Sequence, residues 1–425
     1  MHFLPTLLPL ALTLSSIATS AHADRIGLQR REGLGKRCND HSSSTAASVT
    51  STALEVAPTS PSNKAALGGG GVFGFATLNG GTTGGAGGAE TTVSDLSALR
   101  NAVEGDEAKV VYVSGIIEAS SLPSPVSLVP QLTGPRFPLP AIFFFSFASL
   151  FHGLYLRAQG DGEVVDVGSN TSILPANGGG KDGLTGGGFR VKRTQNVIIR
   201  GLALSKSPAP TDLILVQEGT NVWVDGNTFE SDLDHGKDYY DGQFDCTHAC
   251  DFVTVSNNIF QNAYKTSLVG HSDSNSKEDT GHLRVTFASS SRFRPCVPLL
   301  TSINSSSYAY NLFNNVNSRL PSLRFGTGHI FYYKDILGSG INSRKGAEVL
   351  IEGNYFENSK KPVESSLKKG GVVDGGDNIF IDSDEPDWSV EGTISASDLG
   401  YTYTLEAGAD IPALVTAAAG AANYA

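Results

Sequence analysis

The sequence predicts an all-β fold in which short strands stack into a solenoid, a parallel β-helix. Three observations support this prediction. The 425-residue chain contains 49 glycines and a single methionine, which favours many short strands and turns over helices. A strand–turn–strand phrase recurs along the chain. Hairpin dipeptides, which an antiparallel sandwich would need between its strands, are mostly missing.

The recurring phrase consists of an apolar-alternating strand, then Gly or Asn, then a second short strand. Its clear copies are "NVIIRGLAL" (196–204), "NVWVDGNTF" (221–229), "FVTVSNNIF" (252–260) and "EVLIEGNYF" (348–356), and looser ones are "HLRVTF" (282–287) and "HIFYYKDIL" (329–337). A repeat of roughly 19 to 31 residues is typical of stacked coils. Asparagine suits the turn because it tolerates left-handed geometry and its amide can hydrogen-bond along the stack.

One amphipathic helix is predicted near the start, in "SDLSALRNAVEG" (94–105). Ser94 is the expected N-cap, and Gly105 ends the helix. Its apolar face consists of Leu96, Leu99 and Val103. A solenoid needs its open end covered, so we expect this helix to cap it.

The chain divides into a leader, a linker and one large domain. Residues 1–23 have an apolar run and end in "AHA", which is typical of a cleaved secretory signal, so we expect a secreted, extracellular product. Residues 24–65 contain the dibasic pair Lys36-Arg37 and a Ser/Thr-rich stretch, and they predict a propeptide or linker. Residues 66–425 form the expected β-helix domain.

Two stretches of that domain, about 119–157 and 288–307, fit the repeat badly. The first contains a Phe-rich, Pro-flanked run that is too short for a membrane span, and the second falls inside what should be one coil. We interpret both as anomalous inserts, either retained introns or gene-prediction errors. The alternative is that they are long loops of the protein.

Composition narrows the class of partner. A net charge of −11 argues against nucleic acid, and an anionic polymer would need a local cationic site or bridging metal ions to bind here. We expect no membrane partner and a monomer. Disulfides cannot be the main source of stability, because a chain of this size has only four cysteines: Cys38, Cys246, Cys250 and Cys296.

The stretch "YYDGQFDCTHACD" (239–251) first suggests a soft-metal site of Cys246, His248 and Cys250. Such a site needs a fourth ligand and a sealed or reducing context, and neither is apparent in a secreted chain.

Strand alternation offers another interpretation. If Asp245 faces outward, Phe244 and Cys246 turn into the stack. Cys250 is then a core residue or the disulfide partner of Cys246.

Carboxylates on neighbouring coils provide a second candidate metal site. Asp212 precedes one coil, and Asp241 and Asp245 lie four residues apart one coil later. Hard cations such as calcium prefer several oxygen ligands, although three aspartates are equally compatible with a solvated acidic surface. Three basic residues follow on the next coils: Lys265, Arg319 and Arg324.

The chain resembles the secreted fungal pectate lyases of polysaccharide lyase family 1. The motifs that carry the resemblance are "DLDHGKDYYDG", "THACDFVTVSNN", "YKTSLVGHSDSN", "EDTGHLRVTF", "NNVNSRLPSLRFGTGH" and "SGINSRKGAEVLIEGNYFENSKKPV". The ends "GFATLNGGTTGG" (74–85) and "LGYTYTLEAGADIPALV" (399–415) match as well, so the resemblance covers about 66–118 and 160–425.

The resemblance implies a right-handed parallel β-helix that cleaves de-esterified (1→4)-α-D-galacturonan, the polygalacturonate of pectin. The reaction is a calcium-dependent β-elimination that gives unsaturated oligogalacturonides. Position by position, it implies three calcium ligands, one catalytic base and two residues that grip the substrate carboxylate: Asp212, Asp241 and Asp245 for Ca²⁺, Arg319 as the base at C5, and Lys265 and Arg324 as the grip.

A guanidinium with a pKa above ~12 is a demanding base, so the resemblance predicts an alkaline activity optimum. Neutralising the carboxylate next to the reacting C–H bond lowers the barrier by preorganised electrostatics.

The sequence also departs from the family pattern, which puts calcium affinity and full activity in question. The departures are Pro210 where an aspartate is common, Gly226 where histidine is usual, Gln243 and Cys246 at expected aliphatic positions, and Gln261, Asn262 and Ala263 in place of a His-Asp-His-like run. Sequons for N-glycosylation stand at Asn170 and Asn304, the second inside an insert.

Three other functions remain as alternatives. A pectin lyase would act on methyl-esterified substrate, and would lack the calcium aspartates that are present here. A polygalacturonase would need paired carboxylates, but no adjacent Asp-Asp pair occurs in the chain. The third alternative is a non-catalytic or impaired wall-binding β-helix.

Overall fold

The computed structural model describes residues 71–119, 161–287, 311–330, 333–365, 369–403 and 405–424. All of them belong to one compact unit, residues 62–425. The expected signal peptide and linker lie outside the described residues, as does the insert at 288–307, and the insert at 119–157 is described only at residue 119. Cys38, Cys296 and Asn304 also lie outside them.

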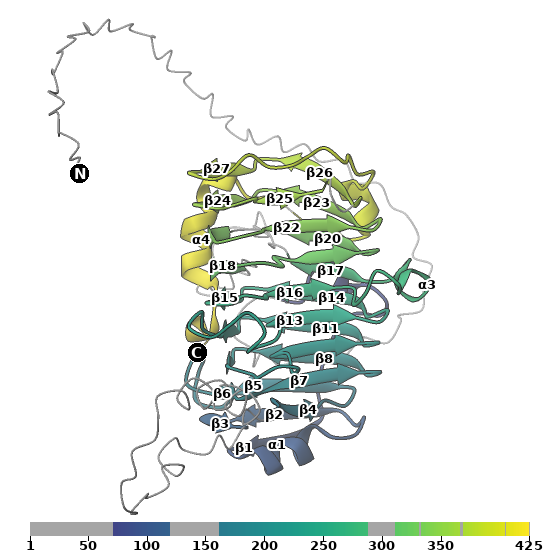
Figure 1. The fold of residues 1–425 in the computed structure, drawn as a ribbon. Coiled ribbons are helices and arrows are strands. Elements are labelled where there is room, and N and C mark those ends of the chain that lie inside the picture. Colours follow the sequence, from purple (N-terminus) through teal and green to yellow (C-terminus); the bar gives the residue numbers. More distant parts are fainter. Residues whose placement is uncertain are drawn as a thin grey trace, which may run out of the picture. The chain divides into compact units, whose positions relative to one another are not determined.

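The unit is a stack of coils, in which a complete coil contributes one strand to each of three sheets whose paired strands all run parallel (Figure 1). We call the ten-, nine- and eight-stranded sheets A, B and C, and the chain visits them in the order C, A, B. This arrangement confirms the predicted parallel β-helix.

Sheet A consists of β1 (Ala89–Val93), β2 (Lys109–Val113), β5 (Thr171–Pro175), β8 (Gln195–Arg200), β11 (Thr220–Asp225), β14 (Asp251–Ser256), β17 (Arg284–Phe287), β20 (Thr327–Ile330), β23 (Glu348–Glu352) and β26 (Gly371–Gly376). Sheet B consists of β3 (Ile116–Glu118), β6 (Gly183–Thr185), β9 (Ala203–Ser205), β12 (Thr228–Glu230), β15 (Ile259–Gln261), β18 (Leu312–Val316), β21 (Tyr333–Ile336), β24 (Tyr355–Glu357) and β27 (Ile379–Ile381). Sheet C consists of β4 (Glu163–Asp166), β7 (Gly187–Lys192), β10 (Ile214–Gln217), β13 (Phe244–Thr247), β16 (Ser267–Val269), β19 (Ser322–Arg324), β22 (Ile341–Arg344) and β25 (Val363–Glu364).

The repeated phrases are the sheet A to sheet B corners of successive coils, as predicted. "NVWVDGNTF" spans β11 and β12, and "FVTVSNNIF" spans β14 and β15. Asparagine was expected both to adopt left-handed geometry and to hydrogen-bond along the stack. In the structure, two neighbouring turn residues share these functions. Gly226 and Asn257 adopt positive φ, and the next residue of each turn is the asparagine that hydrogen-bonds along the stack.

The interior of the solenoid is apolar and close-packed. Most strands turn alternate residues inward, and from β12 onward each sheet B strand adds one inward aromatic ring to a stack. Neighbouring ring centroids lie 4.6–5.0 Å apart along the series Phe229, Phe260, Phe313, Tyr333, Phe356 and Phe380. Ring-to-ring contacts of this kind are favourable only when the coils are in register, so they stabilise the stacking of each coil on the next.

The predicted capping helix is α1 (Leu96–Val103), at the β1 end of the stack (Figure 1). It buries Leu99 and Val103 against the core, as expected. The N-cap prediction was wrong by one residue, because Asp95 rather than Ser94 accepts the hydrogen bond, from the Ala98 N–H at 2.9 Å. Aspartate and serine are comparable N-caps. Because Ser94 and Asp95 are neighbours, the residue type does not decide which of them caps the helix, and the backbone conformation does.

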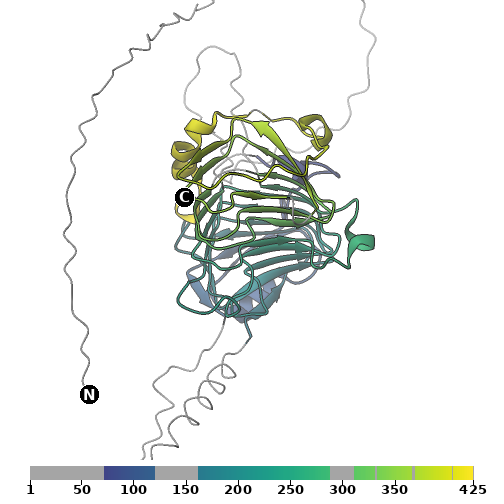
Figure 2. The same ribbon diagram turned by 45° about the horizontal axis from the view of Figure 1, so that its top comes forward.

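The remaining helical elements lie outside the coils. They are η1 (Gly74–Thr77), α3 (Ser276–Asp279), η2 (Ala396–Leu399), η3 (Gly408–Asp410), α4 (Ile411–Ala418) and η4 (Ala421–Asn423). Figures 1 and 2 show α4 running along the stack and α3 protruding from it. Helix α4 packs Ile411 and Val415 against sheet B residues such as Ile259. No helix within the described residues is long and apolar enough to cross a membrane.

Candidate active site

Asp245 lies in the middle of β13 on the outer face of sheet C. Its neighbours Phe244 and Cys246 are fully buried in the core, as strand alternation predicted. The Asp245 Oδ1 accepts the Leu268 N–H of the next coil at 2.9 Å. Burial of the carboxyl raises its pKa to about 7, although the nearby positive charge of Arg319 opposes the rise.

Asp212 lies two residues before β10 and meets Asp245 across Gly242. The Gly242 N–H donates to Asp212 Oδ1 at 2.8 Å. A Cβ on residue 242 would lie 2.5 Å from Asp245 Oδ1 and 2.7 Å from Asp212 Oδ1, so only glycine fits between them. Burial, and then the charges of Asp245 and Asp241, raise the pKa of Asp212 well above its ordinary value.

Asp241 is more exposed than the other two aspartates and is paired with a lysine. Lys265 Nζ lies 3.0 Å from Asp241 Oδ1 and 3.5 Å from Asp238 Oδ1. The lysine side chain is only 15% exposed, so this contact holds its ammonium group beside the acidic cluster. The structure thus places a cation and three carboxylates in one neighbourhood.

Arg319 precedes β19 in a left-handed conformation, with φ at +64°. Its carbonyl accepts the Ser267 N–H at 2.7 Å, which ties the residue to the previous coil. The Arg319 charge acts to lower the pKa values of both Asp212 and Asp245, so the guanidinium lies within electrostatic reach of the acidic cluster. The same left-handed geometry recurs at other coil corners, for example at Arg193, Lys206 and Lys345, so it belongs to the corner rather than to the site.

Arg324 ends β19 and is held on two sides. Its Nε lies 2.6 Å from Asp273 Oδ1, and its Nη1 donates to the Gly270 carbonyl at 2.8 Å. In the parallel ladder Arg324 is aligned with Arg344 of β22, which the sequence analysis did not single out. The repeat could have predicted this alignment, because equivalent positions on successive coils lie on the same face of the sheet.

All six predicted residues therefore lie along sheet C. Two acidic residues, Asp241 and Asp245, come with the β13 coil and Asp212 with the coil before it, and the cations come with the β16 and β19 coils. The acidic group is suited to a hard cation, because its donors are carboxylate oxygens and two of the carboxyls are buried next to each other. In the described part of the chain, no three His, Cys, Asp or Glu side chains are already arranged to hold a metal ion.

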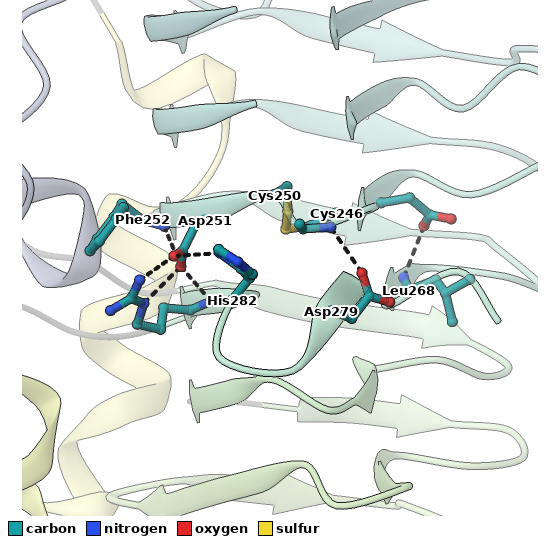
Figure 3. The surroundings of a disulfide bond; sticks show 10 residues. Cys246, Cys250, Asp251, Phe252, Leu268, Asp279 and His282 are labelled. Carbon is teal, nitrogen blue, oxygen red and sulfur yellow. Dashed lines mark hydrogen bonds and ion pairs between the residues drawn. A yellow bond between two sulfur atoms is a disulfide. The ribbon is translucent and has the colours of Figure 1, made fainter. Parts of the chain in front are cut away.

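The soft-metal interpretation of "YYDGQFDCTHACD" is excluded by a disulfide between Cys246 and Cys250 (Figure 3). Both cysteines are fully buried, so the prediction of core residues is confirmed, and of the two alternatives for Cys250 the structure shows the disulfide. His248 and Ala249, at the tip of the closed turn, both have φ near +54°.

Besides Cys246, whose sulfur forms the disulfide, two departures from the family pattern have structural explanations. A Cβ on Gly226 would lie 1.6 Å from a ring carbon of Tyr424, so the glycine makes room for the C-terminal tyrosine. Gln243 is fully buried, and its Nε2 donates to the Gln261 carbonyl at 2.9 Å. Neither glutamine side chain has a described contact with the acidic cluster. Nothing in the structure explains Pro210.

A parallel β-helix with an acidic cluster beside a row of cations on one sheet is suited to binding an anionic polymer. Comparisons with known proteins identify the family. Residues 156–293 and 304–422 match the family described as Pectate lyase. The chain is 41% identical to the probable pectate lyase A of Aspergillus niger over 383 residues, 88% of this chain and 96% of that relative. It is 38% identical to pectate lyase A of Emericella nidulans, over 82% of this chain and 86% of that one.

Solved structures of similar fold are also pectate lyases. A pectate lyase from Bacillus sp. N165 in complex with trigalacturonate aligns with a TM-score of 0.59 and 26% identity, over 82% of this chain and 98% of that one. Pectate lyase II from Xanthomonas campestris aligns with a TM-score of 0.58 and 26% identity, over 83% and 99%. The chain therefore belongs to the pectate lyase family, whose members are polysaccharide lyases.

Proposed function

We propose that the protein is secreted and cleaves de-esterified (1→4)-α-D-galacturonan by calcium-dependent β-elimination, releasing unsaturated oligogalacturonides. One observation carries the proposal. The buried carboxyls of Asp212 and Asp245 both lie against Gly242, on the face that also bears Lys265, Arg319 and Arg324. Buried acids of raised pKa next to a cationic row provide a place for a divalent ion and for an anionic sugar beside it. The disulfide is consistent with an oxidising, extracellular destination.

Asp212, Asp241 and Asp245 would hold the calcium ion. When bound, calcium neutralises and polarises a galacturonate carboxylate. Asp241 pairs with Lys265 at 3.0 Å, so its engagement with a cation would release the lysine ammonium toward substrate. Cation binding by Asp241 and substrate binding by Lys265 would therefore be coupled through this contact.

The protein's basic residues would carry the remaining chemistry. Lys265 and Arg324 grip the carboxylate next to the reacting carbon, which spreads the negative charge that develops when the C5 proton leaves. Arg319 is the proposed base. Its backbone is fixed by the Ser267 contact, which ties it to the previous coil.

The test is to follow the ultraviolet absorbance of unsaturated uronide on polygalacturonate and on highly methyl-esterified pectin. We expect product from polygalacturonate with calcium, loss of product with a chelator, and recovery when calcium is added back, with an alkaline optimum. Product from methyl-esterified pectin in chelator would instead identify a pectin lyase. Absence of product at every pH would favour a wall-binding protein without activity.

A further inference from the structure

Asp273, a residue outside the proposed catalytic set, faces three cations of sheet C and the adjoining turn. Its Oδ1 lies 2.6 Å from Arg324 Nε and 3.4 Å from Arg344 Nη2, and its Oδ2 lies 3.5 Å from Lys345 Nζ. The hydrogen bond from Arg324 is the strongest cause of the lowered pKa of Asp273, so the carboxylate is charged in the folded protein.

The contacts with Arg324 fix the orientation of its guanidinium group. Asp273 holds Nε, and the Gly270 carbonyl holds Nη1 at 2.8 Å. A guanidinium is planar, so two held nitrogens define the plane and direction of the third. The Arg324 side chain is only 11% exposed, and it has little freedom beyond these contacts.

Asp273 also offsets repulsion within the cationic row. Arg324 and Arg344 are aligned across β19 and β22, and burial together with the charge of Arg324 lowers the pKa of Arg344. Removing Asp273 would leave like charges facing one another, and an arginine with one of its two anchors lost would turn away.

The loop that carries Asp273 is itself anchored to residues 246–250, the turn that the disulfide closes, which we call the disulfide turn. We call residues 270–283, between β16 and β17, the anchored loop. Its Asp279 Oδ1 accepts the Ala249 N–H at 2.9 Å, and its Leu283 N–H donates to the Cys250 carbonyl at 2.9 Å. Figure 3 shows Asp279 and His282 on either side of the turn closed by Cys246 and Cys250. The disulfide turn thus holds both the strand of Asp245 and the loop of Asp273.

We infer that Asp273 is a positioning residue that sets the Arg324 guanidinium for a substrate carboxylate, held in place by the disulfide turn. This inference rests on the proposed function for the identity of the ligand. Its geometric part, the orientation of Arg324, does not.

The experiment compares Asp273→Ala and Asp273→Asn with wild type and with Glu385→Ala. Glu385 is exposed, and its replacement changes the net charge by the same amount. Steady-state kinetics on polygalacturonate with calcium, the melting temperature, and crystal structures of both Asp273 variants are measured. For Asp273→Ala we expect kcat/KM to fall on the order of 100-fold, mainly through a higher KM, because small misplacements of a binding group have effects of this size. Asn retains an acceptor oxygen, so Asp273→Asn should be intermediate, and Glu385→Ala should match wild type.

A purely structural role predicts a lower melting temperature and fewer active molecules with KM unchanged, and that result would overturn the inference. A lower KM in Asp273→Ala would overturn it as well, because it would show that Asp273 competes with substrate. The crystal structures decide the geometric part independently of activity. Arg324 should leave the Gly270 carbonyl in Asp273→Ala, and an unmoved Arg324 would refute positioning even if the wild type proved inactive on polygalacturonate.

Discussion

Among the carboxyls that the structure describes, those of Asp212 and Asp245 are unfavourable to keep charged without a bound cation. Each is a buried carboxyl close to other negative charge, and burial is the main cause of both raised pKa values. A native protein retains such a pair when something else compensates for the charge, and here the cations of the next coils do so only in part. The pair therefore costs stability while both carboxyls are charged and no cation is bound, and in the proposed function it would provide the affinity for calcium.

This cost predicts a pH dependence in calcium-free protein. The pKa of Asp245 rises from an unfolded value of about 4 to about 7, so the folded state binds more protons between these values. The free energy of unfolding should fall as pH rises through this window and then level off. Asp245→Asn should flatten this part of the curve and, above pH 7, stabilise the calcium-free protein by roughly 2–4 kcal/mol.

Denaturant unfolding in chelator across pH 4 to 9, with wild type and Asp245→Asn side by side, measures both effects. The Leu268 N–H can still donate to the Asn side-chain oxygen, so loss of that bond should not confound the comparison. Calcium should stabilise the wild type and have little effect on Asp245→Asn. Equal calcium stabilisation of the two proteins would remove Asp245 from the ligand set.

At the level of elements, the asparagine ladder links the corners of the coils. Asn258 Oδ1 accepts the Asn227 N–H at 2.8 Å, and its Nδ2 donates to the Val224 carbonyl at 3.0 Å. Asn311 repeats the pattern on the following coil. Each side chain thus satisfies a backbone N–H of the turn and adds a hydrogen bond to a strand carbonyl one coil away, which explains why the repeat favours the residue.

Replacing Asn258 with alanine should therefore leave the buried Asn227 N–H without its partner. We expect a loss of about 1–3 kcal/mol, the usual cost of one unsatisfied buried group. Asn101→Ala, on the exposed side of α1, is the control and should change stability by less than about 0.5 kcal/mol. Urea unfolding of the two variants measures the difference, and similar values would show that the ladder contributes little.

The insert at 288–307 can be tested against the register of the strands that flank it. β18 pairs with β15 so that Leu312 is opposite Ile259, and β17 pairs with β14 so that Thr286 is opposite Thr254. A tight corner of the kind found between β14 and β15 would therefore be restored by deleting residues 289–309.

We predict that the chain lacking 289–309 folds with unchanged or higher melting temperature and at least the activity of the full chain. Far-ultraviolet circular dichroism, thermal unfolding and the lyase assay measure this. Transcripts that lack the coding sequence for about 119–157 and 288–307 would support the interpretation as retained introns. Spliced transcripts that contain both segments would refute it.

For the whole molecule, the C-terminal segment closes a buried polar cluster on the outside of the solenoid. Arg200 Nε lies 2.8 Å from Asp225 Oδ2, and the guanidinium carbon lies 4.7 Å from the centroid of the Tyr424 ring. The Tyr424 hydroxyl donates to the same carboxylate at 2.5 Å. The ring also fills the space that Gly226 leaves open. One residue near the end of the chain thus shields an ion pair that belongs to the middle coils.

Tyr424→Ala should destabilise the protein by about 3–5 kcal/mol, because it opens a cavity and exposes the ion pair. Tyr424→Phe keeps the ring and loses the hydroxyl's hydrogen bonds with Asp225 and Arg200, so it should cost about 1–3 kcal/mol. Chemical denaturation measures both. If Tyr424→Ala matched wild type, the C-terminal segment would not stabilise the solenoid.

Much of this molecule could be predicted from its sequence. The spacing of the strand–turn–strand phrase predicted the coils, and alternation within "FDC" predicted which side chains of β13 face inward, because both follow from local backbone geometry. The resemblance named six site residues, and the structure places all six along sheet C.

Tertiary structure alone decided the contacts between distant segments. Asp273 meets Arg324 across 51 residues, and Tyr424 reaches Asp225 across 199. Loops that leave the stack have no repeating hydrogen-bond pattern to constrain them, so their side-chain partners depend on how the whole chain is packed. The repeat therefore determined the scaffold and its faces, whereas the packing of loops and termini onto that scaffold determined how the cations are oriented and which polar groups are closed off from water.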